Sequence, residues 1–168
     1  MSIPASSRGI SLLEVLVALT IFSIGAIGLS GWMTLAARAT HAGYLRTQAS
    51  FLAGDMVERM RANPAGVRAD AYEGEAQGGA TACGIAAACA PGALAAHDRA
   101  MWAARLQTVL PKGKGTIHCD RHMVVSPAGT PTPFSGLCTM TVRWLERGAG
   151  DRQHRAAAMR SLAWVFQP

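Results

Sequence analysis

The fold is decided near the start of the chain by residues 8–22, RGISLLEVLVALTIF. A leader whose only cation is Arg8 ends in Gly9, and an apolar run begins at once. From Val15 to Ala37 no residue is charged. A helix of about 23 residues is roughly 34 Å long, enough to cross the hydrocarbon core of a bilayer. Because a chain in lipid must satisfy its own backbone hydrogen bonds, we expect a membrane-spanning helix here.

The small residue at which the leader could be cut lies before the apolar run. In an ordinary secretory signal the cut follows a shorter apolar region, which is then discarded. Cleavage after Gly9 would instead remove only residues 1–9 and leave a mature chain that begins at Ile10 with a free amine. We therefore expect the apolar helix to stay on the mature protein.

Glu14 is the one carboxylate in this apolar run. A lone charge at the centre of a membrane helix costs about 2.5 to 3.5 kcal/mol and calls for a partner. Ile10 and Glu14 are four residues apart, so the new amine and the carboxylate share a helix face, and a carboxylate in the first turn suits the helix dipole. The pair could form within one molecule or between neighbours, or Glu14 could extend to the headgroups. The spacing leaves these readings open.

The pattern of residues 8–19 resembles the class III signal of type IV pilins and pseudopilins. The resemblance implies that a prepilin peptidase cuts between Gly9 and Ile10 and methylates the amine of Ile10. It also implies that Glu14 takes part in subunit docking within a filament. Many members have Phe or Met where this chain has Ile10. Since the site needs a bulky apolar residue, we still expect cleavage.

Two further segments, residues 23–29 (SIGAIGL) and 49–64 (ASFLAGDMVERMRANP), are similar to the PilV-type minor pilins. These are also called type IV pilus modification proteins. The likeness is tight over about the first 64 residues and weaker beyond them. It implies a scarce subunit that helps to prime and adjust pilus assembly, with prepilin peptidase, other minor and major pilins and the inner membrane as partners.

The distribution of positive charge on the two sides of the span bears on which side of the membrane the head lies. The formal net charge is +6. The leader carries only Arg8, whereas Arg38, Arg46, Arg59 and Arg61 follow the span, so the positive-inside rule favours a cytoplasmic head. We nevertheless expect a single-pass protein with a periplasmic head, found in the pilus after assembly. Four cysteines in the C-terminal part suit an oxidising compartment, and the resemblance implies a cytoplasmic leader.

Beyond the span the helix is expected to continue as an amphipathic one. Apolar residues recur every three or four positions up to Asn63-Pro64, where proline disfavours helical geometry at the residue before it. This stripe consists of Leu45, Ala49, Leu52, Met56 and Met60. We therefore divide the chain into a leader (1–9), a transmembrane or filament-core helix (10–37), its amphipathic continuation (38–63) and a globular pilin head (64–168).

The head is predicted to contain a loop, a helix and a small antiparallel sheet. Residues 67–92 are rich in Gly and Ala and are expected to form a connecting loop. A helix is expected over 93–110, and strands over 116–125, around 138–145 and over 159–166. The buried faces are assigned to Leu94, Met101, Trp102, Leu106, Val109 and Leu110 in the helix, Cys138, Met140, Val142 and Trp144 in the middle strand, and Leu162, Trp164 and Phe166 in the last. The fold class is therefore α+β and pilin-like, with a long N-terminal helix packed against this sheet.

The four cysteines allow three pairings. We favour Cys83 with Cys89, which closes a short loop, and Cys119 with Cys138, which ties two strands across a Pro-rich connection. Such bridges contribute about 2 to 4 kcal/mol each. Free buried thiols are the alternative, and an oxidising compartment argues against them.

One cluster has the residue types of a zinc site: His118, Cys119, Asp120, Arg121 and His122. On a strand, however, its two histidines stand far apart, and no second cluster has a zinc-module spacing. We therefore predict no metal site and no cofactor. No nucleophile, zinc-protease or phosphate-loop motif is present, so we expect no enzyme.

Two other functions remain open on the sequence. A type II secretion system minor pseudopilin would be built alike but would drive secretion. A surface receptor for DNA or host ligands is permitted by the basic balance. Its charges would have to cluster in the fold; they are Lys112, Lys114, Arg143, Arg147, Arg152 and Arg155.

Overall fold

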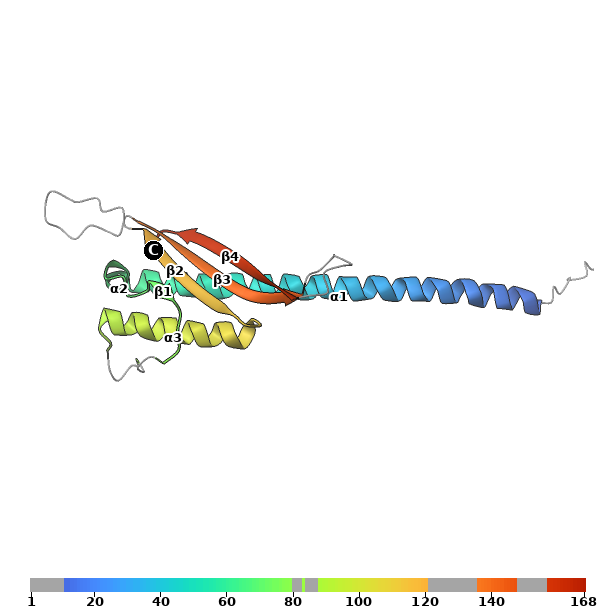
Figure 1. The fold of residues 1–168 in the computed structure, drawn as a ribbon, viewed down its shortest axis with the longest axis horizontal. Helices are drawn as coiled ribbons and strands as arrows, with labels where there is room; N and C mark the ends of the chain where they lie inside the picture. Colours follow the sequence, from blue (N-terminus) through green and yellow to red (C-terminus); the bar gives the residue numbers. More distant parts are fainter. Residues whose placement is uncertain (1–10, 80–82, 84–87, 121–135, 148–156) are drawn as a thin grey trace, which may run out of the picture.

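The structure is a computed structural model and describes residues 11–79, 83, 88–120, 136–147 and 157–168. Its elements are α1 (Leu12–Ala62), α2 (Pro64–Arg68), β1 (Gly74–Glu75), α3 (Pro91–Val109), β2 (Lys114–Asp120), β3 (Leu137–Arg147) and β4 (Ala157–Phe166). Figure 1 shows that α1 is far longer than the rest of the molecule, so that its first half projects alone. The α+β, pilin-like architecture expected from the sequence is confirmed.

The second half of α1 forms the spine of the head. Before Ala42 none of its described residues is buried, whereas from there on one residue per turn or more is enclosed. The buried set is Ala42, Leu45, Ala49, Leu52, Ala53, Met56, Val57 and Met60. It contains every member of the predicted stripe, which is therefore confirmed as the core face of the helix.

Helix α1 ends at the predicted place, but the chain does not become a plain loop there. The Asn63 side chain accepts a hydrogen bond from the backbone N–H of Gly66 at 3.1 Å and so caps α2, which opens with Pro64. This arrangement follows the usual preference for Asn before a helix and Pro at its first position. Residues 67 and 68 are thus helical. Further on, β1 pairs with β2, and α3 begins at Pro91, so the expectation of a loop over the whole of 67–92 is wrong in these three places.

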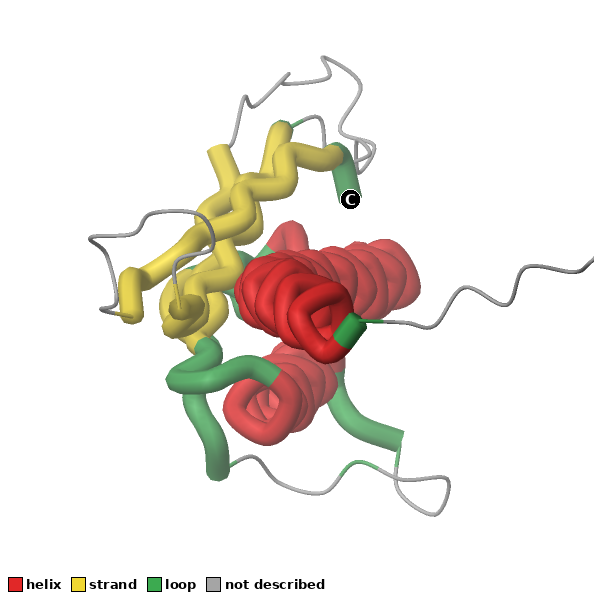
Figure 2. Tube along the Cα trace, turned by 90° about the vertical axis from the view of Figure 1, so that its right-hand side faces the viewer, coloured by secondary structure: helices red, strands yellow, loops and turns green. Residues whose placement is uncertain are grey.

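The four strands form one antiparallel sheet in the order β1-β2-β3-β4. Alternate residues of β3 face the core, as the sequence predicts, and all four of its assigned core residues are buried. The sheet lies on one side of α1 while α3 packs along another, as the view along the helix in Figure 2 shows. The indole N–H of Trp102 donates to the Leu52 carbonyl at 2.9 Å and ties α3 to α1.

Two large side chains assigned to the core lie at its margin. Met101 is 42% exposed, because the inward line of α3 runs through Ala95, Trp102 and Leu106 and leaves Met101 to one side. Trp164 is 41% exposed because β4 is the edge strand of the sheet. Periodicity identifies a face of an element but not how far the neighbouring elements cover it.

Candidate assembly surface and adjoining cavity

The first half of α1 carries an apolar surface that no other described part of the chain covers. Its exposed large side chains are Leu12, Leu13, Val15, Leu16, Val17, Leu19, Ile21, Phe22, Ile24, Ile27, Leu29, Trp32, Met33 and Leu35. By length and composition the helix can cross a membrane. The core helix of a soluble protein can pass the same test, but the most apolar window of α1 has no buried residue. Exposed apolar surface on this scale marks contact with a membrane or with other protein chains.

The hydroxyl groups within this surface are satisfied inside the helix. Each donates to a backbone carbonyl three or four residues earlier, at 2.7 to 3.0 Å. The four residues are Thr20, Ser23, Ser30 and Thr34. Since an unpaired polar group in hydrocarbon is costly, this internal pairing lets the whole surface enter an apolar medium.

Glu14 differs from these hydroxyl groups, because it is the charged side chain within the apolar surface. It lies in the first turn of α1, after Ser11, whose side chain makes no capping hydrogen bond. No ion pair joins Glu14 to any residue that the structure describes. Gly9 and Ile10 lie outside the described residues, so cleavage, methylation and an amine partner for Glu14 stay predictions.

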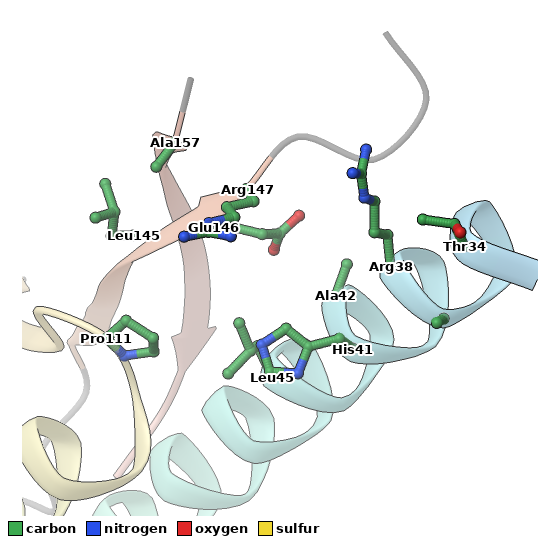
Figure 3. A pocket seen from close by; sticks show the side chains of 11 residues that line it. Thr34, Arg38, His41, Ala42, Leu45, Pro111, Leu145, Glu146, Arg147 and Ala157 are labelled. Carbon is green, nitrogen blue, oxygen red and sulfur yellow. The ribbon is translucent and has the colours of Figure 1, made fainter. Parts of the chain in front are cut away.

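A cavity of about 580 Å³ opens where α1 leaves the head (Figure 3). Its lining comes from α1, the turn after α3, and β3 and β4. The lining residues are Thr34, Ala37, Arg38, His41, Ala42, Leu45, Pro111, Leu145, Glu146, Arg147 and Ala157. The cavity thus joins the apolar surface of α1 to the core of the head.

The buried carboxylate of Glu146 lies at the back of this cavity. Only 2% of the residue is exposed. Its two oxygens accept from Arg46 at 3.2 Å and from the indole N–H of Trp144 at 3.1 Å, and Arg160 lies 3.8 Å away. Glu146 has no motif in the sequence that marks it as a site residue. Its burial could have been predicted from its position two residues beyond Trp144, because alternate residues of a strand share a face.

Comparison with known families identifies the chain. Residues 4–30 match the prokaryotic N-terminal methylation motif, and residues 33–100 match type IV pilin Tt1218. The chain is a type IV pilin. Pilins are structural proteins, and such a protein interacts with a prepilin peptidase and with other pilins. No curated protein and no solved structure matches the chain.

Both disulfides of the pilin head are formed in the structure. Cys83 is bonded to Cys89, and Cys119 is bonded to Cys138. The second bridge joins residues that face each other in neighbouring strands, with their Cα atoms 4.0 Å apart. These are the two pairings favoured from the sequence.

A second buried carboxylate, Asp98, fixes α3 of the pilin head. It accepts from Arg59 at 3.0 Å and from the Tyr72 hydroxyl at 2.8 Å. Burial, together with the bond to Asp98, raises the pKa of Tyr72. Burial by itself would lower the pKa of Arg59, but its bonds to Asp98 and Asp55 outweigh that effect and raise it. Asp98 was missed from the sequence, although it lies on the same helix face as Trp102.

The polar cluster around His118 forms an exposed ion pair. The His118 ring lies 2.6 Å from Glu73 and 3.5 Å from Asp120. The bond to Glu73 raises the pKa of His118. Among the described residues no three His, Cys, Asp or Glu side chains are grouped to hold a metal ion, and His122 lies outside them.

The described cations among those considered for DNA binding lie in three places: on β2 and β3, at the cavity, and in the turn after α3. Lys114 and Arg143 are neighbours across β2 and β3, but Lys114 is paired with Glu75 at 2.9 Å. Arg147 lines the cavity instead. Arg152 and Arg155 are outside the described part of the chain. Lys112 follows α3 in a turn, with φ of 54°.

Proposed function

We propose that this type IV pilin is a PilV-type minor pilin that takes part in priming and assembling a type IV pilus. Prepilin peptidase removes residues 1–9 and methylates Ile10. Residues 10–37 hold the protein in the inner membrane, residues 38–63 continue the helix into the head, and the head (64–168) lies in the periplasm. The observation that carries the proposal is the uncovered apolar half of α1, with its single carboxylate in the first turn.

A polar group supplies part of the drive to leave the bilayer, beside the close packing of helices. Lipid tails are as apolar as Leu, so moving the helix from lipid into a bundle of helices gains little hydrophobic free energy. Gly25, Gly28 and Gly31 have open space around them and allow neighbouring helices to approach closely. An unpaired Glu14 costs up to about 2.5 to 3.5 kcal/mol in the membrane, the value for a charge at the helix centre, and a partner amine relieves this cost. Pairing Glu14 with the Ile10 amine of a neighbouring subunit therefore favours the filament.

Intact-mass measurement of the membrane-extracted protein tests the processing step. A chain that begins at Ile10 and carries one added methyl group is expected. A chain that retains Met1, or that lacks the apolar helix, contradicts the proposal. Purification of the protein with a secretion platform and not with pili would assign it to the pseudopilins instead.

The Glu14→Ala variant tests the docking role. Processing should be unchanged, while incorporation into pili should fall about tenfold or more, since the polar drive of order 2.5 kcal/mol is lost. Glu58→Ala is the matched control, because Glu58 is an exposed carboxylate of the same helix in the head. Equal incorporation of the Glu14→Ala and Glu58→Ala proteins, measured by quantitative immunoblotting of sheared pili, would defeat the role of Glu14.

A further inference from the structure

We propose that the cavity between α1 and the β3–β4 end of the sheet binds the headgroup of an anionic phospholipid while the pilin is anchored in the membrane. This inference rests on the membrane anchorage in the proposed function. It adds a specific lipid contact to what would otherwise be a simple anchor.

The cavity lies at the depth of the lipid headgroups. The charge-free part of α1 ends at Ala37, and Arg38 is the first charged residue after it. At 1.5 Å per residue, His41 and Leu45 stand about 5 and 11 Å beyond Arg38, whereas the headgroup layer is about 5 to 8 Å thick on each side. Ala37, Arg38 and His41 all line the cavity, which therefore opens onto the membrane surface.

The unpaired charges of the cavity are positive. Arg38 from α1 and Arg147 from the end of β3 both line it (Figure 3), and neither makes an ion pair with a described residue. The one carboxylate is Glu146, whose side chain is 1% exposed and already bonded to Arg46. Two guanidinium groups thus remain for an anion, and Arg suits phosphate because it can donate two parallel hydrogen bonds.

The rest of the lining is apolar and continuous with the span. Ala42, Leu45, Pro111 and Leu145 form the inner wall, and Ala37 connects it to the exposed apolar surface of α1. An occupant that fits both parts has an anionic group beside the arginines and an acyl chain along the helix. A phospholipid has this form. The helix of a second copy of this chain has no charge between positions 15 and 37, so that segment would leave both guanidinium groups without a partner.

Lipid retention by the full-length protein tests the proposal. The protein is reconstituted in phosphatidylcholine nanodiscs that contain a minor fraction of phosphatidylglycerol, and retained lipids are counted by native mass spectrometry after extraction. The wild type should retain phosphatidylglycerol in preference to phosphatidylcholine. Arg38→Gln combined with Arg147→Gln should lower that preference about tenfold or more, the effect expected for removing two cations at an anionic membrane surface.

Two further variants distinguish a specific lipid-binding site from a non-specific effect of positive charge. Arg68→Gln combined with Arg143→Gln removes the same charge from exposed positions that do not line the cavity, and it should change the preference by less than about twofold, because distant surface charges are screened. Ala157→Trp keeps both arginines but fills the mouth of the cavity from an exposed position. It should lower phosphatidylglycerol retention as the double Arg38/Arg147 variant does.

Each contrary outcome has a distinct meaning. Equal loss in the Arg38/Arg147 and Arg68/Arg143 variants, or full retention by Ala157→Trp, overturns the site. Crosslinking of the cavity to a second copy of the chain in place of lipid overturns it in favour of a pilin neighbour. A protein that inserts stably but shows no lipid preference defeats only this inference. Failure to insert into phosphatidylcholine at all defeats the membrane anchorage, and with it the proposed function.

Discussion

The two halves of α1 are one continuous helix with opposite surroundings. From Leu12 to His41 no described residue is buried, and from Ala42 onward a regular stripe is enclosed by α3 and the sheet. The polar groups differ in the same way. Hydroxyl groups bond back to the helix in both halves, but in the second half Arg46 and Arg59 also reach carboxylates on other elements.

The difference shows that helix formation and burial are decided separately. The first half has no partner within the described chain and must find one in lipid or in other subunits. The second half finds its partner in its own head, which fixes the direction in which the first half projects. Three predictions test this contrast, and they begin with the largest expected effect.

The largest difference is expected between alanine substitutions of two methionines, one in each half of α1, in their effect on the stability of the head. Met56 is fully buried and Met33 is 64% exposed. Met56→Ala should destabilise the head by about 2 to 5 kcal/mol, because it removes buried methylene groups and leaves a cavity. Met33→Ala should leave head stability unchanged. Chemical denaturation of the detergent-solubilised protein, followed by near-UV circular dichroism, measures both, and equal losses would contradict the division of the helix.

The paired carboxylates of the head provide the second test. Asp98→Asn leaves one acceptor oxygen for the two donors, Arg59 and Tyr72, and removes the negative charge, so it should cost about 1 to 3 kcal/mol. Glu58→Gln breaks an exposed pair with Arg61 and should cost less than about 0.5 kcal/mol. The same denaturation experiment compares them. A smaller loss for Asp98→Asn than for Glu58→Gln would show that the buried network does not hold α3 in place.

The smallest effect is expected at the exposed surface of the head. The bond to Glu73 raises the pKa of His118 above its ordinary value of about 6.5. The pair therefore stabilises the fold fully below about pH 6.5 and loses its contribution as the pH rises through the folded-state pKa. Glu73→Gln should lower the pKa of His118, and Asp120→Asn should lower it less. An NMR titration of the His118 ring measures the pKa, and the reverse order would contradict the assignment of Glu73 as its main partner.

Local patterns in the sequence were sufficient for most of the elements. The stripe from Leu45 to Met60, the end of α1 at Asn63 and the alternation along β3 each depend on residues close in sequence. The sequence was less informative where a neighbouring element decides the outcome. The two-residue strand β1 has no apolar pattern and exists through its pairing with β2, and Trp164 is exposed because its strand is at the edge.

Consecutive residues are enough to specify the apolar span with one carboxylate near its start, because charge, length and helical spacing are local properties of the chain. Tertiary structure alone decided where that helix becomes buried, which partners Glu146 and Asp98 have, and that Arg38 and Arg147 line one cavity. Arg38 and Arg147 are more than a hundred residues apart in the chain. Only the packing of the sheet against α1 places both at one cavity, and no local pattern encodes that placement.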